Sequence, residues 1–299
     1  MATCALRTTT KNSSAPVVVR IASIDSWCIN VADQDWLIDR IVQDVGDGRG
    51  GTVFTINLDH LAKLRSDADF RAAYQRAAYV SADGVPVVML ARAEGVPIER
   101  VTGADLVVPL CRAAAAAGIS VHFFGTRPEI LERAVARLAA DIPGLVVAGS
   151  EAPAVGFEPR SEEARSAVAR IAASGAGICF VALGAPRQEL FADAAQSWSQ
   201  GVVYLGVGAA LDFLAGERLR APHLLQRLGL EWLWRTAQEP RRMLPRYARS
   251  AGWLLGYLLR LIAGVTRLAA VQVDVATDPR RPCADRSSAS TAKAREVSR

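Results

Sequence analysis

The sequence predicts an α/β fold, a Rossmann-like sheet with flanking helices, followed by a C-terminal helical membrane-binding appendage. Between residues 21 and 225, short apolar runs alternate with Ala-rich helical runs, which is typical of a sheet with crossover helices. After residue 226 the chain becomes first aromatic and arginine-rich, then strongly apolar, then polar. The predicted regions are a flexible tail (1–20), an α/β core (21–225), a helical membrane-associating segment (226–272) and a disordered tail (273–299).

Composition limits the classes of protein to be considered. The chain has 299 residues, 51% of them hydrophobic and 22% charged, so it can bury a substantial core. The net charge of +5 comes mostly from arginine, which suits phosphate and carboxylate partners, although an arginine-rich genome gives the same bias. The five cysteines are scattered and the N-terminus is polar. We therefore expect a reducing compartment, no signal peptide and a cytoplasmic body.

The predicted core elements follow in order along the chain. Short apolar runs bounded by turn residues predict six strands, at 52–56, 79–81, 119–124, 145–148, 178–183 and 202–205. Helical patterns occupy 33–45, 60–77, 104–117, 128–140, 161–174, 187–200 and 222–238. Ligands of open α/β sheets bind at the carboxyl ends of strands, so the polar residues at those ends are the candidate site residues.

The first two strands end in candidate polar groups. Thr55, Asn57 and Asp59 follow one another at the first strand end; one of the last two can cap the next helix, and the surplus indicates ligand binding by Thr55 and Asn57. Asp83 follows the second strand and precedes Gly84. A carboxylate there can be partly desolvated, which raises its pKa and suits a general base. An N-cap aspartate explains the same local sequence equally well.

Two further junctions favour phosphate and sugar groups. Arg100 and Thr102 stand at the start of the Ala-rich helix, where free backbone N–H groups attract anions; a capped helix with a surface arginine is the alternative. Gln188 follows the strand that stops at Gly184, and its amide can hydrogen-bond a sugar or a nucleobase. The adjacent Glu189 is explained by the helix dipole alone.

The last strand leads into a glycine-rich turn. Gly206 and Gly208 fit the first two glycines of a dinucleotide fingerprint, but Leu211 stands at the third position. The turn is still compatible with close approach to a ribose or diphosphate, with Asp212 as a hydroxyl acceptor. No metal and no other cofactor is expected, because the Asp-Ala-Asp at 67–69 lies within a predicted helix and the three histidines form no cluster with cysteine.

Taken in order, these five junctions resemble the WecG/TagA/CpsF glycosyltransferases, which build cell-surface polysaccharides on polyprenyl diphosphate carriers. The similarity continues through Arg220-Ala221-Pro222, Glu231-Trp232, Arg235, Glu239-Pro240-Arg241-Arg242 and Arg246-Tyr247. It covers residues from about 50 to 247.

The resemblance implies an inverting, metal-independent hexosyltransferase that moves a sugar from a UDP-sugar to a polyprenyl-diphosphate-linked saccharide, in cell-surface or exopolysaccharide biosynthesis. It assigns the base to Asp83. The other roles it implies are a sugar and acceptor pocket (Thr55, Asn57, Gln188), a diphosphate site (Arg100, Thr102), a nucleoside turn (Gly206, Gly208, Asp212) and closing arginines (Arg235, Arg242, Arg246). A basic interfacial face that never touches substrate is the alternative for the arginines.

The apolar run from Trp253 to Ala270 indicates a membrane surface as a further partner. It contains Arg260 and Arg267 on one helical face, and a central arginine costs about 2.5–3.5 kcal/mol in a spanning helix. An in-plane amphipathic helix leaves both arginines at the headgroups. We therefore expect a peripheral protein at the cytoplasmic face of the plasma (inner) membrane.

Two other classes compete with this interpretation. A nucleotide-dependent oxidoreductase would place its glycine-rich turn early, with an acidic residue about twenty residues on; here the turn comes near the end of the sheet. A non-catalytic basic scaffold explains the arginines but not the polar strand ends. Nucleic acid is not expected as a partner, and nothing in the sequence excludes a homo-oligomer.

Overall fold

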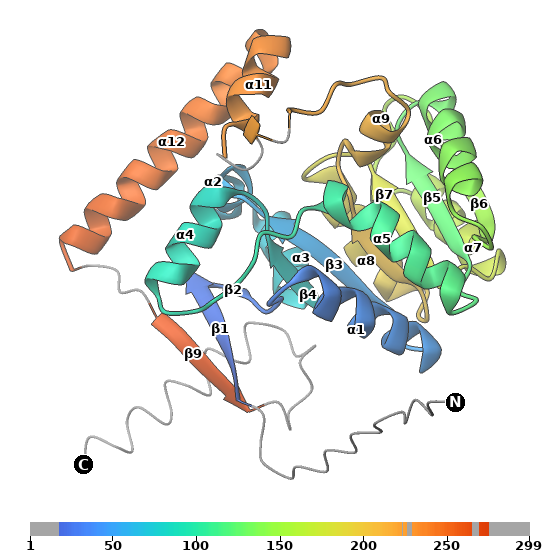
Figure 1. The fold of residues 1–299 in the computed structure, drawn as a ribbon, viewed down its shortest axis with the longest axis horizontal. Coiled ribbons are helices and arrows are strands. Elements are labelled where there is room, and N and C mark those ends of the chain that lie inside the picture. The colour runs from blue at the N-terminus through green and yellow to red at the C-terminus, as the bar shows by residue number, and fades with distance from the viewer. Residues whose placement is uncertain (1–17, 223, 226–228, 265–268, 275–299) are drawn as a thin grey trace, which may run out of the picture.

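A computed structural model describes residues 18–222, 224–225, 229–264 and 269–274. Its centre is a sheet of six parallel strands in the order β4-β3-β8-β7-β5-β6 (Figure 1). The strands are β3 (Gly51–Ile56), β4 (Tyr79–Ala82), β5 (Val121–Gly125), β6 (Val147–Glu151), β7 (Ile178–Ala182) and β8 (Val203–Gly206). Each of these six strands overlaps one of the predicted apolar runs. The predicted α/β fold with a flanked sheet is confirmed.

Helices cover both faces of this sheet. Adjacent residues of β3 belong to different hydrophobic cores, Val53 to one and Phe54 to the other, because successive side chains of a strand point to opposite faces. The core around Val53 is covered by α1 (Gln34–Gly46), α5 (Gly103–Ala116), α6 (Pro128–Asp141) and α9 (Ala210–Leu214). The core around Phe54 is covered by α2 (Leu58–Ser66), α3 (Ala68–Arg76), α4 (Val85–Ala93), α7 (Glu162–Ala173) and α8 (Arg187–Trp198).

Two predicted helices are shorter than expected. The helix predicted over 60–77 is broken at Asp67, which ends α2 and caps α3 by accepting a hydrogen bond of 2.9 Å from the Phe70 N–H. The Asp-Ala-Asp sequence therefore stands at a helix junction and not inside one helix. Within the helix predicted over 222–238, the described α11 spans only Glu231–Gln238, after Gly229 with a φ of +71°.

The C-terminal segment ends in a strand that the sequence did not predict. α12 spans Pro240–Ile262 and stops before Gly264, whose φ of +69° suits a glycine after a helix end. β9 (Ala269–Asp274) then pairs antiparallel with β1 (Val18–Ile24), which also pairs with β2 (Trp27–Ile29). The helix predicted over 253–270 therefore ends at Ile262, and Ala269 and Ala270 belong to β9; residues 265–268 lie outside the described residues. β1 begins inside the predicted tail 1–20, and β9 crosses the predicted boundary at 272; residues 1–17 and 275–299 lie outside the described residues.

α12 packs one face against the body of the protein (Figure 1). Trp253 and Tyr257 are buried in the core around Phe54, and their rings stack at a centroid distance of 5.1 Å. Arg260 lies 3.8 Å from Asp25 and over the Tyr257 ring; Arg267 lies outside the described residues. The opposite face exposes Leu255, Leu258, Leu259 and Ile262. No helix in the described ranges combines the length and apolarity that crossing a membrane requires.

Candidate active site

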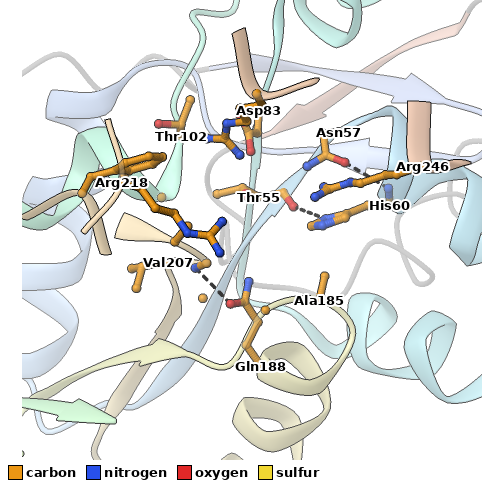
Figure 2. A pocket seen from close by; sticks show the side chains of 18 of the residues that line it. Thr55, Asn57, His60, Asp83, Thr102, Ala185, Gln188, Val207, Arg218 and Arg246 are labelled. Atoms are coloured by element: carbon orange, nitrogen blue, oxygen red, sulfur yellow. Dashed lines mark hydrogen bonds between the residues drawn. The ribbon is translucent and has the colours of Figure 1, made fainter. Parts of the chain in front are cut away.

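The carboxyl ends of β3, β4, β7 and β8 open on one cavity of about 290 Å³, here called the polar cavity. All but two of the residues predicted for the site line it: Thr55, Asn57, Asp83, Thr102, Gln188, Gly206, Gly208, Arg235, Arg242 and Arg246. Figure 2 shows several of them pointing toward a common space. Residues far apart in sequence meet here because parallel strands end at the same edge of the sheet.

Asn57 serves both as a cap and as a site residue. Its side-chain oxygen accepts a hydrogen bond of 3.0 Å from the His60 N–H at the start of α2. Its amide also hydrogen-bonds the Asp83 carboxylate. The hydrogen bond that caps α2 therefore also fixes the orientation of the Asn57 amide, which contacts the candidate base Asp83.

Asp83 is not a helix cap, which decides the ambiguity left by the sequence. The N-cap of α4 is Gly84, and this helix has no side-chain cap among the described residues. The Asp83 N–H donates to the Ile56 carbonyl oxygen at 2.8 Å, so its backbone is fastened to β3. Burial raises the pKa of the half-buried Asp83 carboxyl; nearby Arg235 opposes this shift, and nearby Glu231 adds to it.

Gln188 joins two strand ends. Its side-chain oxygen accepts from the Gly208 N–H at 3.0 Å, and its side-chain nitrogen donates to Glu189 at 2.8 Å. A Cβ at Gly206 would stand 3.0 Å from that nitrogen, so only glycine leaves the amide in place. Glu189 is fully buried and its pKa is raised to about 7 by burial. The helix dipole alone therefore does not explain Glu189, which the sequence analysis missed as a support for Gln188.

Two predicted residues lie outside the polar cavity. Arg100 pairs with Asp105 at 3.4 Å. The Asp212 carboxylate accepts from the Thr126 hydroxyl at 2.8 Å and pairs with Arg218 at 3.2 Å, so both of its oxygens are engaged within the protein. Thr102 does line the cavity, and its hydroxyl also caps α5 by accepting from the Asp105 N–H at 3.1 Å.

The polar cavity is rich in cations. Among its described lining residues are Lys63, Arg187, Arg218, Arg220, Arg235, Arg242 and Arg246, against the three carboxylates Asp83, Glu231 and Glu239. Lys63, Arg187 and Arg218 were not predicted as site residues, and only the Arg-Ala-Pro match pointed toward Arg220. Lysine and arginine side chains in such a cavity suit a diphosphate.

Contacts with the core hold the C-terminal arginines in the cavity. Arg246 pairs at 3.1 Å with the buried Asp59 of α2, which also pairs with Lys63. Arg235 pairs at 2.7 Å with Glu231 and lies over the Phe213 ring, 5.3 Å from its centroid. These contacts place Arg235 and Arg246 at the strand ends, where Arg242 also lines the cavity.

A second cavity of about 400 Å³, here called the apolar groove, adjoins the first. Mostly apolar side chains of α2, α4, α11 and α12 line it, among them Leu58, Val85, Pro86, Val87, Trp232, Tyr247 and Leu254. Arg100 lies here as well. Asn57, Asp83, Glu231, Arg235 and Arg246 line both cavities. Asp83 therefore stands at the junction of a cationic space and an apolar one.

The model of the WecG/TagA/CpsF glycosyl transferase family matches residues 20–266. The chain belongs to this family. The resemblance noted from the motifs is thus confirmed, and the match extends from β1 through α12. It makes the protein a glycosyltransferase of cell-surface polymer synthesis, a class that uses sugar nucleotides as donors and lipid-linked acceptors. In the described part of the chain, no group of three His, Cys, Asp or Glu side chains is arranged to hold a metal ion.

Proposed function

We propose that this protein is an inverting, metal-independent hexosyltransferase that transfers a sugar from a UDP-sugar to a saccharide on polyprenyl diphosphate. The observation that carries the proposal is the position of Asp83 between the polar cavity and the apolar groove. One cavity has the charge that a nucleotide diphosphate needs, and the other has the apolar lining that a polyprenyl chain needs.

The polar cavity would hold the donor. As the anomeric carbon–oxygen bond breaks, negative charge develops on the departing UDP, and fixed donors in a partly dry site stabilise such charge strongly. Arg218, Arg235 and Arg246 are supported from behind by carboxylates. The N-terminal residue Gly103 of α5 also lines the cavity, where backbone N–H groups favour an anion. These groups supply the electrostatic role that a divalent cation has in other sugar transferases.

The apolar groove would hold the start of the acceptor lipid, with its saccharide turned toward Asp83. The acceptor hydroxyl oxygen attacks the anomeric carbon, its proton goes to the Asp83 carboxylate, and the bond to the diphosphate breaks. Attack opposite the leaving UDP inverts the configuration. Because burial raises the pKa of Asp83, its carboxylate is a stronger base than that of an exposed aspartate.

The exposed apolar face of α12 supports peripheral binding at the cytoplasmic side of the plasma membrane. Leu255, Leu258, Leu259 and Ile262 are exposed on this face, and Arg241 and Arg249 are exposed nearer its start. An in-plane helix buries such apolar side chains at the boundary between headgroups and acyl chains, while basic residues meet anionic lipids. This orientation would bring the apolar groove, which Leu254 lines, close to the lipid carrier.

The test is UDP release by the full-length protein. UDP-glucose, UDP-N-acetylglucosamine and UDP-N-acetylmannosamine would be screened against a short-chain polyprenyl diphosphate that carries an N-acetylhexosamine. We expect one donor to give acceptor-dependent UDP release, a product of inverted anomeric configuration, and the same rate in EDTA. Loss of activity in EDTA with recovery in Mn²⁺ would contradict the metal-independent reaction, and no release from any donor would contradict the donor class.

A further inference from the structure

The polar cavity has many hydrogen-bond donors and few free acceptors. Its seven cationic side chains can only donate. Of the three amide side chains, the buried Gln188 and its neighbour Asn57 have oxygens that already accept, from the Gly208 N–H and from the His60 N–H. Both therefore offer mainly N–H groups to a ligand. The third, Gln238, is exposed and donates to the Leu219 carbonyl oxygen at 3.3 Å. Hydroxyl groups of a bound sugar also need acceptors.

The carboxylates of the cavity do not meet this need freely. Glu231 pairs with Arg235, and Glu239 pairs with Arg218 and Arg242. Asp83 is the proposed base. Among the buried hydroxyl and imidazole groups that line the cavity, the Thr102 hydroxyl is already engaged with Asp105, which leaves the Thr55 hydroxyl and the His60 ring as neutral acceptors.

The contacts of His60 fix which ring nitrogen carries the proton. Nδ1 lies 2.8 Å from the Thr55 carbonyl oxygen and 2.8 Å from the Tyr74 hydroxyl. The Tyr74 hydroxyl donates its own proton to the same carbonyl at 2.7 Å. A carbonyl can only accept and a phenol has one proton, so Nδ1 must be protonated for both contacts to form. The lone pair is then on Nε2, to which no described residue donates a hydrogen bond.

His60 also keeps this form across the physiological pH range. Its side chain is 3% exposed. Burial, together with the positive charges of Lys63 and Arg246, lowers the pKa of His60 to about 3. The imidazole is therefore neutral, and Nε2 remains an acceptor from weakly acidic to alkaline pH. Figure 2 shows the ring beside Arg246, with its hydrogen bond to Thr55.

We propose that His60 determines donor specificity by accepting, at Nε2, a hydrogen bond from one hydroxyl of the sugar being transferred. The proposal rests on the proposed function. It assigns the contact to the donor sugar because His60 lines the polar cavity and not the apolar groove. Tyr74 is a positioning residue, since it acts on Nδ1 and the Thr55 carbonyl behind the ring. No proton is transferred to His60 in the reaction.

Monodeoxy analogues of the best UDP-hexose from the donor screen would test this contact. In the wild type, removal of the one hydroxyl that His60 receives should lower kcat/KM about 10- to 100-fold. In His60→Phe, kcat/KM for the parent UDP-hexose should fall by a similar factor. In the same variant, kcat/KM for the analogue that lacks this hydroxyl should be no more than about 3-fold below that for the parent. Kd for UDP alone should change less than about 3-fold. The proposal would be overturned if, for every analogue, the ratio of kcat/KM between parent and analogue were the same in His60→Phe as in the wild type.

Two more measurements separate specificity from a packing defect. His60→Gln keeps an acceptor oxygen, so it should regain part of the discrimination that His60→Phe loses, at an equal or lower Tm. In ¹⁵N spectra of the wild type, the His60 Nε2 resonance should be that of an unprotonated nitrogen from pH 5 to 8. It should move when the UDP-sugar is added and not when UDP is added. A protonated Nε2, or equal shifts with both ligands, would refute the proposal even if the donor screen found no activity.

Discussion

The carboxyl edge of the sheet and the C-terminal helices build opposite halves of the site by different physical means. At the sheet edge, Thr55, His60 and Gln188 are buried and joined by short hydrogen bonds to neighbouring backbone. α11 has no buried residue, and the Arg242 side chain of α12 is 61% exposed. The sheet edge supplies fixed groups for recognition, together with the Asp83 carboxylate as the proposed base. The helices supply charge, held mainly by ion pairs.

This difference predicts which kinetic constants should change when each half of the site is mutated. Groups fixed by the sheet should affect the chemical step and the choice of sugar. Arginines on the helices should affect stabilisation of the leaving diphosphate, and their effects should be smaller because solvent reaches them. Four variants, from the largest expected effect to the smallest, test the division.

Asp83→Asn should lower kcat by about 10³-fold, since an amide cannot take the acceptor proton. Kd for UDP, measured by calorimetry, should stay within about 2-fold because Asp83 does not bind the diphosphate. The exposed Asp39→Asn on α1 is a matched control and should leave both quantities unchanged. A variant that retains a tenth of wild-type turnover would remove Asp83 from the role of base.

Arg235→Ala should lower kcat by about 10²-fold, the scale expected for one donor to developing charge. The neighbouring Arg241→Ala changes an exposed arginine that lines neither cavity, and it should have no more than about a 2-fold effect. Steady-state kinetics with saturating acceptor would measure both. Equal effects of the two substitutions would mean that the C-terminal arginines form only a basic surface.

Replacement of Leu255, Leu259 and Ile262 by serine should weaken binding to phosphatidylglycerol vesicles about 10-fold or more, because each exposed apolar side chain loses its transfer free energy. Vesicle sedimentation measures this. Val155→Ser removes an even more exposed apolar side chain before α7 and should not change binding. Turnover of a short, soluble acceptor should be retained, and its loss would show that this face of α12 also supports the site.

Glu231→Gln should shift the acid limb of the kcat/KM profile to lower pH. Asp83 is active when ionised, so activity falls as the pH drops through its pKa. The Glu231 charge helps to raise that pKa and Arg235 opposes it. Removal of Glu231 therefore lowers the pKa, whereas Arg235→Ala raises it. A shift of both variants in the same direction would contradict this coupling between the helices and the base.

The core could be predicted from sequence because its signals are local. Apolar runs such as 178–183 fix a strand, and Asn57 and Thr102 are helix caps in the structure as well as cavity residues. Local sequence could not decide whether Asp83 is a cap, because that depends on the backbone at Gly84. It also could not show that Glu189 is buried, since burial there comes from elements that are distant along the chain.

The C-terminal segment was harder to predict, for a different physical reason. Periodicity shows which residues share a helix face but not whether protein or lipid covers that face. Trp253, Tyr257 and Arg260 had the composition of a membrane interface, yet they pack on the core and on Asp25. Likewise, β9 pairs with β1 from the opposite end of the chain, a contact without any local sequence signal.

The pairing of β1 with β9 has a topological consequence. The polypeptide leaves the six-stranded sheet after β8 and lines the polar cavity with residues of α11 and α12. It then forms β9, which pairs with β1 in a separate three-stranded sheet, from Val18↔Asp274 to Ser23↔Ala269. α11 and α12 are therefore attached to the rest of the protein at both ends, through β8 before them and through the pairing of β9 with β1 after them. A tag or truncation at β9 would therefore alter the second of these two attachments, although β9 is distant along the chain from Asp83.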